Sequence, residues 1–127
     1  MAELGIGTRL SHDRNVAKVE IVVDGEATKP ITLDLDQLTN LIAALGELRA
    51  RMLEGRPMIK LEGKDVRTVN CPNWYIQVAK IDGSLLAFDH PGFGPLGFAI
   101  PKSEVAAMVR ILNTHLAMPA PKPERRN

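Results

Sequence analysis

Three side chains have the chemistry of a possible catalytic site: Cys71, Asp89 and His90. A nucleophilic cysteine needs a nearby base. His90 is the only plausible base, and either Asn73 or Asp89 could orient its imidazole. Adjacent residues of a strand point to opposite faces, however, so Asp89 and His90 can meet only where the strand has ended. A free cysteine is more commonly a small apolar residue, and we favour that interpretation of Cys71 over catalysis.

The loop at residues 89–95 is the most unusual segment, because two prolines and two glycines surround one phenylalanine. Proline stiffens a loop, while glycine lets backbone amides approach a ligand. Two aromatic residues on a predicted strand nearby add a second candidate surface, since an exposed aromatic side chain can anchor a partner. The simpler alternative, which we favour, is that all three aromatic side chains pack onto the protein itself. The candidate binding residues are Gly92, Phe93, Gly94, Trp74 and Tyr75.

A group of basic residues at 49–64 could contact phosphates. Acidic residues alternate with them, which is typical of a solvated surface. The whole chain has 16 Lys and Arg against 15 Asp and Glu, so a net charge of +1 provides no broad field that would attract nucleic acid. Nucleic-acid binding is therefore the third-ranked hypothesis. The basic residues are Arg49, Arg51, Arg56, Lys60 and Lys64.

Motifs for metals and cofactors are missing from the sequence. It contains no C-x-x-C pair, no H-E-x-x-H and no glycine-rich phosphate loop, so we predict neither a metal site nor a cofactor. The single cysteine excludes an internal disulfide and fits a reducing compartment. No apolar stretch has the length of a signal peptide or a bilayer span. By elimination we expect a cytoplasmic protein with no membrane partner.

The elements that would position these residues follow from hydrophobic periodicity. Residues 16–24 and 29–35 alternate as strands, and Asp24-Gly25 between them suits a hairpin turn. An apolar stripe at three- and four-residue steps predicts a helix that is capped by Asp36 and ends at Gly55.

The second half of the chain repeats this order of strands followed by a helix. Residues 58–62 could form a short edge strand, and so could residues 66–69. Clearer strands at 73–80 and 85–89 flank the turn dipeptide Asp82-Gly83, and a further short strand is expected at 96–100. A second apolar stripe then predicts a helix that starts near Pro101 or Ser103.

The predicted architecture is α+β, a mainly antiparallel sheet of five to six strands with two helices on one face. The expected order is two strands, a helix, four strands and a helix. Hairpin-length connections require antiparallel neighbours. We expect a flexible arm at 1–15, a single domain at 16–117 and a Pro-rich, disordered tail at 118–127.

The strands at 16–23 and 75–81 carry apolar residues on both faces, more than two amphipathic helices could cover. We therefore expect a small non-enzymatic interaction or regulatory module that forms a homodimer, with a further protein partner as a possibility. One alternative is a small-molecule binder or minor enzyme that uses the 89–95 loop with Cys71 and His90. The other is a weak nucleic-acid binder that uses residues 49–64.

Overall fold

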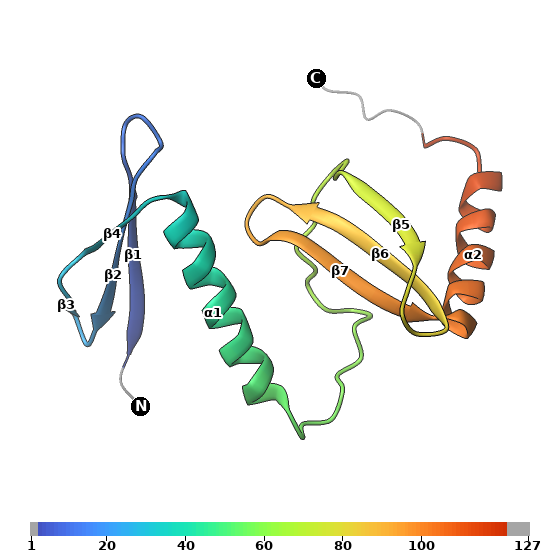
Figure 1. Cartoon of the computed structure of the whole chain (residues 1–127), viewed down its shortest axis with the longest axis horizontal. Coiled ribbons are helices and arrows are strands. Elements are labelled where there is room, and N and C mark those ends of the chain that lie inside the picture. The colour runs from blue at the N-terminus through green and yellow to red at the C-terminus, as the bar shows by residue number, and fades with distance from the viewer. Residues whose placement is uncertain (1–2, 122–127) are drawn as a thin grey trace. The chain divides into compact units, whose positions relative to one another are not determined.

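The computed structural model describes residues 3–121, which divide after Val66 into two compact units. Each unit is an antiparallel sheet followed by one helix, as Figure 1 shows. The α+β class with antiparallel strands is therefore confirmed. The strands do not form the expected single sheet, because they divide between a first sheet in the N-terminal unit and a second sheet in the C-terminal unit. The far end of the expected tail lies outside the described residues.

The first sheet contains a strand that we had assigned to a flexible arm at 1–15. Apolar residues and threonine alternate there with glycine and arginine, which is the period of a half-buried strand. This strand pairs along its whole length with the next one. The strands are β1 (Leu4–Leu10), β2 (Ala17–Val23), β3 (Glu26–Ala27) and β4 (Ile31–Leu33).

The predicted turn at Asp24-Gly25 joins β2 to β3. Both residues have positive φ, 50° and 85°, as a type I′ hairpin turn requires. β3 and β4 both pair with β2, but the register shifts by one residue between Val22↔Ala27 and Val19↔Ile31. The extra residue makes a bulge at the edge of the sheet. Pro30 has no N–H to donate, and it is tolerated here because an edge or bulge position needs no ladder hydrogen bond from its nitrogen.

Helix α1 (Leu35–Leu53) has its N-cap at Asp34, two residues before the expected cap. Asp34, not Asp36, accepts a hydrogen bond from the N–H of Gln37 at 2.8 Å, and the Gln37 side chain accepts from the N–H of Asp34 at 2.9 Å. This reciprocal pair is a capping box. Asp36 instead lies in the first turn, where a negative charge favours the helix dipole.

Only the start of α1 packs on the first sheet. Leu38, Leu41 and Ile42 are half-buried, whereas Leu48 and Met52 farther along the same stripe are exposed. Residues 54–73 then contain no strand. The short strands expected at 58–62 and 66–69 are absent, and Met58 is fully exposed. A lone extended segment without a neighbouring strand has no ladder of hydrogen bonds to stabilise it.

The second sheet is a three-stranded meander. Residues 79–82 connect its first two strands, so the hairpin predicted from Asp82-Gly83 is present, and the register aligns residues in rows across the sheet. The 89–95 loop is shorter than expected, because strand pairing continues to His90 and resumes at Gly94. The strands are β5 (Trp74–Val78), β6 (Gly83–His90) and β7 (Gly94–Pro101).

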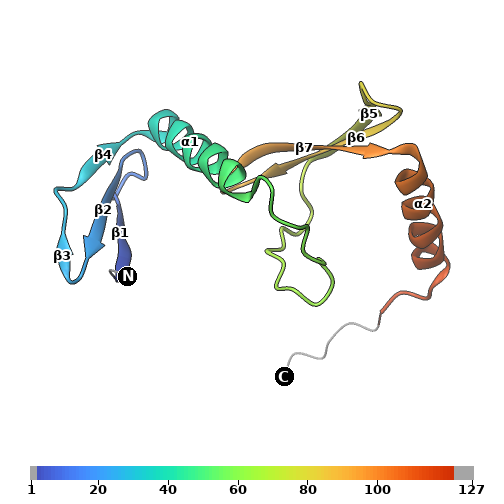
Figure 2. The same cartoon turned by 90° about the horizontal axis from the view of Figure 1, so that it is seen from below.

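Helix α2 (Lys102–Ala117) starts directly after β7, with Pro101 as its N-cap residue. It projects from the end of the β6–β7 hairpin and does not lie across the strands (Figures 1 and 2). Val105 and Ala107 near its start are half-buried, while Leu112 and Leu116 are exposed. Neither described helix has the length and hydropathy needed to cross a bilayer.

Burial is slight throughout residues 3–121, where only Ala87 of the second sheet is buried, at 8% exposure. Each helix touches its own sheet through its first turns alone. The apolar face of each sheet consequently remains exposed within its unit.

We expected the strand at residues 16–23 to carry apolar side chains on both faces, and the first sheet shows that it does not. Its register places Val19, Ile21 and Val23 on one face with the apolar residues of β1 and β4. The opposite face carries Lys18 and Glu20 and is polar apart from Val22. Two-sided apolar character is therefore wrong for this strand.

Candidate functional site

A groove of about 600 Å³ lies on one face of the second sheet. This groove face carries the side chains of Tyr75 and Asp89, two of the candidates from the sequence. Ala87 and Gly97 are neighbours in the central row, and their small size leaves the hollow between larger residues. The complete lining is Asn73, Trp74, Tyr75, Leu85, Ala87, Phe88, Asp89, Pro95, Leu96 and Gly97.

The chemistry of the groove is mainly apolar with polar groups at one end. Asp89 is the only charged residue that lines it. Asn73 lies next to Asp89, because the N–H of Asp89 donates to the carbonyl oxygen of Asn73 at 3.0 Å. A volume of this size is within the range of small-molecule sites, which typically combine an apolar wall with a few polar groups.

His90 shapes the turn between β6 and β7. Its Nδ1 accepts hydrogen bonds from the N–H groups of Gly92 at 2.9 Å and Phe93 at 3.2 Å. The imidazole also stacks on the Phe93 ring, with centroids 4.5 Å apart. Nδ1 is thus an acceptor and the neutral ring carries its proton on Nε2. Gly94 completes the turn with φ 78°, a conformation that glycine adopts without strain.

Asp89 and His90 point to opposite faces of β6, because both remain paired within the strand. The structure therefore does not bring this carboxylate onto the imidazole. Phe93, Gly92 and Gly94 belong to the His90 turn and do not line the groove.

Cys71 is exposed and has φ 53°, an uncommon conformation for a residue other than glycine. The hydrogen bond between Asn73 and Asp89 extends the β5–β6 pairing by one residue beyond β5. Cys71 lies two residues before Asn73 in the chain. The described residues include no hydrogen bond between the Cys71 thiol and His90, and a catalytic role for Cys71, Asp89 and His90 stays a prediction.

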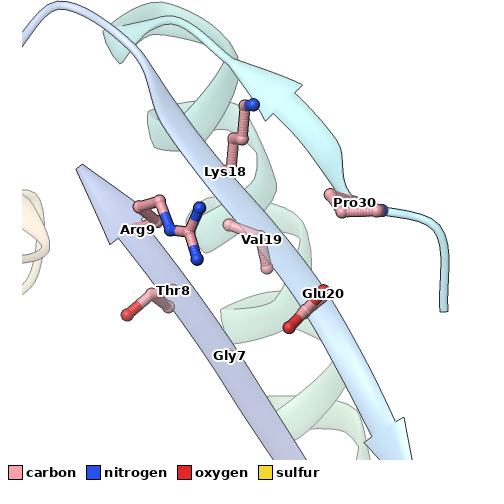
Figure 3. Close-up of a pocket in the computed structure, with 7 residues that line it drawn as sticks. All are labelled: Gly7, Thr8, Arg9, Lys18, Val19, Glu20 and Pro30. Carbon is pink, nitrogen blue, oxygen red and sulfur yellow. The ribbon is translucent and has the colours of Figure 1, made fainter. Parts of the chain in front are cut away.

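A smaller cavity of about 190 Å³ lies on the polar face of the first sheet. The Arg9 guanidinium extends from β1 toward β2, where Lys18 and Glu20 follow one another along the strand (Figure 3). Glu20 leans over Gly7, since a Cβ atom added to that glycine would come within 2.9 Å of Glu20 Oε1. The lining residues are Gly7, Thr8, Arg9, Lys18, Val19, Glu20 and Pro30.

The sequence argument missed Arg9 because it treated the first 15 residues as an arm, and it therefore had no residue to set opposite Lys18. A signal was present, since Gly5, Gly7 and Arg9 alternate with bulkier residues in the way of a one-sided strand. The register that sets Arg9 opposite Lys18 could not be derived from composition alone.

The basic residues at 49–64 are all exposed and follow the last turns of α1 and the segment after it. No cavity among those described is lined by them. Binding of nucleic acid through these residues stays a prediction.

Metal-binding groups of three or more His, Cys, Asp or Glu side chains are not found in residues 3–121. The functional candidates are thus the groove, the polar cavity and the exposed apolar faces. In comparisons with known proteins, the chain matches no family model, no curated protein and no solved structure.

Proposed function

We propose that this protein is a small non-enzymatic interaction module that acts as a homodimer, with the aromatic face of the second sheet as its self-association surface. This face is opposite the one that carries Tyr75, Ala87 and Gly97, and its residues Trp74, Phe88 and Leu96 also border the groove. Three rows form it, and none contains a charged residue. The rows are Trp74–Phe88–Leu96, Ile76–Leu86–Phe98 and Val78–Ser84–Ile100.

Exposure of the aromatic face is the observation that supports the proposal. Trp74 is 65% exposed, Val78 84% and Phe98 52%. Helix α2 leaves these side chains uncovered. Monomeric proteins rarely expose contiguous apolar patches beyond a few hundred Å². The exposed parts of Trp74, Phe88 and Phe98 alone amount to roughly 300 Å², to which the aliphatic side chains of the face add. Because the face is uncharged, two copies can stack on it without repulsion between like charges.

A comparison of the free energy of burial with the cost of association indicates whether the aromatic face alone can hold a dimer together. Covering the four most exposed side chains of the face contributes about 6–12 kcal/mol of transfer free energy. Loss of translational and rotational freedom opposes association by roughly 4–15 kcal/mol. These ranges overlap, so the aromatic face alone gives at best a weak dimer. The exposed stripe of α2, with Leu112 58% and Leu116 83% exposed, is the additional surface that a stable dimer can use.

Light scattering during size exclusion tests the proposal at micromolar concentrations. We expect the wild type to elute at twice 13.9 kDa. Ile76→Asp places a charge in the centre of the aromatic face and should give a monomer. Gln77→Asp is the matched control, because it places the same charge on the groove face of the same strand.

Fluorescence distinguishes a dimer from a chain that covers its own surface. Trp74 is the only tryptophan, so quenching by acrylamide reports the aromatic face directly. We expect Trp74 to be shielded in the wild type and accessible in Ile76→Asp. A wild-type monomer would contradict the proposal, whether Trp74 is shielded or exposed.

We infer as a second candidate function that the groove binds a small amphipathic cation, an inference supported by its volume and by Asp89 as its only charge. An aromatic ring could lie beside Tyr75, with its ammonium group toward Asp89. Benzylamine should raise the melting temperature while benzoate should not, because only a ligand that prefers the folded state stabilises it. Asp89→Asn should remove this difference, and equal responses to both compounds would contradict the inference.

A further inference from the structure

We propose that the polar face of the first sheet binds a phosphate monoester whose organic part carries hydroxyl groups. The register aligns Arg9 with Lys18 and Lys18 with Thr32. The three residues therefore form one row across β1, β2 and β4. Directly paired residues on one face have Cβ atoms about 4.5–5.5 Å apart, so a guanidinium, an ammonium and a hydroxyl group can converge on one ligand.

The two cations of this row are unfavourable for the sheet in the absence of a ligand. Like charges directly opposite one another in an antiparallel pair are destabilising. Neither Arg9 nor Lys18 has an ion pair or a side-chain hydrogen bond among residues 3–121. The nearest carboxylate on this face, Glu20, lies in the next row and leans over Gly7. A bound anion would offset the repulsion between Arg9 and Lys18 more directly than Glu20 does from the next row.

The cavity beside the row limits the size of the ligand. Its volume of about 190 Å³ is below the 300–1,000 Å³ of typical cofactor and drug-sized sites. It therefore suits a small molecule or a single group. Figure 3 shows Arg9 and Lys18 at one end of this cavity and Glu20 and Pro30 at the other.

Phosphate fits the cationic end better than a carboxylate does. The planar guanidinium of Arg9 can donate two parallel hydrogen bonds to phosphate oxygens, and Lys18 adds a second positive charge. Two cations and the Thr32 hydroxyl match a doubly charged group with three free oxygens. A carboxylate has one charge and would use only part of the row.

Glu20 at the other end determines what the phosphate is attached to. A second anionic group would be repelled there, whereas a hydroxyl group can donate to the carboxylate oxygens. The structure thus points to a phosphorylated polyol rather than a diphosphate. This inference does not depend on the dimer proposal, because it concerns the first sheet and the dimer surface belongs to the second.

The full chain can be titrated with glycerol 1-phosphate, methyl phosphate and acetate, and followed by amide chemical shifts. We expect saturable shifts centred on Arg9, Lys18 and Thr32 for both phosphates, tighter binding of glycerol 1-phosphate, and no saturation with acetate. Lys18→Met keeps the alkyl stem and removes the charge, so phosphate affinity should fall about tenfold or more. Lys29→Met is the matched control and should bind as the wild type does.

Melting temperatures provide a second readout, because Lys18→Met should raise the melting temperature of the free protein but reduce the further rise that phosphate causes. Without phosphate, Lys18→Met should melt above the wild type, since repulsion from Arg9 is removed. With saturating glycerol 1-phosphate, the wild type should gain more than the variant. If Lys18→Met is stabilised equally in both conditions, or if Lys29→Met loses as much affinity, the row is an unliganded charged surface and the proposal fails. Arg9→Gln provides the same comparison if Lys18→Met does not fold.

Discussion

At the scale of the residue, side chains in this protein act mostly on the backbone next to them. His90 accepts from two amides of its own turn, and Asp13 accepts from the Ser11 hydroxyl at 2.6 Å and the N–H of Asn15 at 3.1 Å. Such local bonds replace the strand ladder where the chain reverses. They explain how turns with exposed side chains can still have one defined conformation.

Replacement of His90 by alanine should lower the free energy of unfolding by about 1 kcal/mol, because the Gly92 and Phe93 amides lose their acceptor. His90→Asn should recover part of this loss, since an asparagine oxygen can accept from the N–H two residues later. Urea denaturation measures the change, and amide exchange at Gly92 and Phe93 locates it. Unchanged exchange at both amides in His90→Ala would show that the imidazole does not hold the turn.

Asp13 predicts a local dependence on pH. The Ser11 hydroxyl and the Asn15 amide hold the pKa of its carboxyl below the ordinary value of 3.8. A lowered folded-state pKa means that the ionised form stabilises the turn above that ordinary value, and that this contribution is lost as the pH falls through the folded pKa. Carboxyl chemical shifts should give a midpoint below 3.8, and the Asn15 amide should titrate with it. Asp13→Asn should abolish that titration.

Sequence reasoning at this scale identified residues better than it identified their partners. Tyr75, a candidate binding residue, and Asp89, a candidate catalytic residue, both line the groove, while their roles stay predictions. Arg9 and Lys18 were overlooked because their juxtaposition depends on strand register, which arises from pairing between separate segments. The Asp89–His90 pair did not form for a more local reason. Strand β6 continues one residue farther than the loop composition implied, so the two side chains point to opposite faces.

At the scale of the element, local chemistry sets most boundaries. Asp24-Gly25 produced the predicted hairpin because both residues adopt the positive φ that its tight turn requires. The hairpin predicted at Asp82-Gly83 also formed, but Gly83 is the first residue of β6 and is needed there for its close approach to the Ile100 carbonyl. Helix starts were less certain, since Asp34 and Asp36 are both good caps and only the reciprocal bond with Gln37 selects the first. The short strands at 58–62 and 66–69 failed because propensity alone does not supply a neighbouring strand.

Two glycine-to-alanine changes should have opposite effects on stability. A Cβ atom at Gly83 would collide with the carbonyl oxygen of Ile100, which is backbone and cannot rotate away. Gly83→Ala should therefore cost about 1–3 kcal/mol or prevent pairing of β6 with β7. Gly46 lies within α1 with nothing near its added methyl group, so Gly46→Ala should gain roughly 0.5–1 kcal/mol. Thermal denaturation of both variants tests these two changes in stability. If both variants were stabilised, or both destabilised, the result would contradict the local geometry at one of the two glycines.

At the scale of the whole molecule, each unit presents one sheet with a face that its own helix does not cover. The amount of apolar surface was predictable from the sequence, because alternating strands and two striped helices are visible in it. Its distribution was not, since the division into two sheets depends on which strands pair. Pairing between distant segments is decided by the balance of loop closure and side-chain packing, neither of which composition reveals.

Self-association should make thermal stability depend on concentration. The melting temperature of the wild type should rise as protein concentration increases, because a second copy binds the folded state and not the unfolded one. In Ile76→Asp this dependence should vanish, while Gln77→Asp should retain it. Scanning calorimetry over a hundredfold range of concentration measures the trend. A melting temperature that is constant for the wild type would argue against a dimer.

Cys71 offers a practical route to the geometry of such an assembly. It is the only thiol in the chain, and it is exposed in the segment before β5. A nitroxide spin label can therefore be attached there without substituting any residue. Pulsed electron resonance on the labelled protein would then yield one intermolecular distance, which fixes how far apart the two copies hold this end of their sheets.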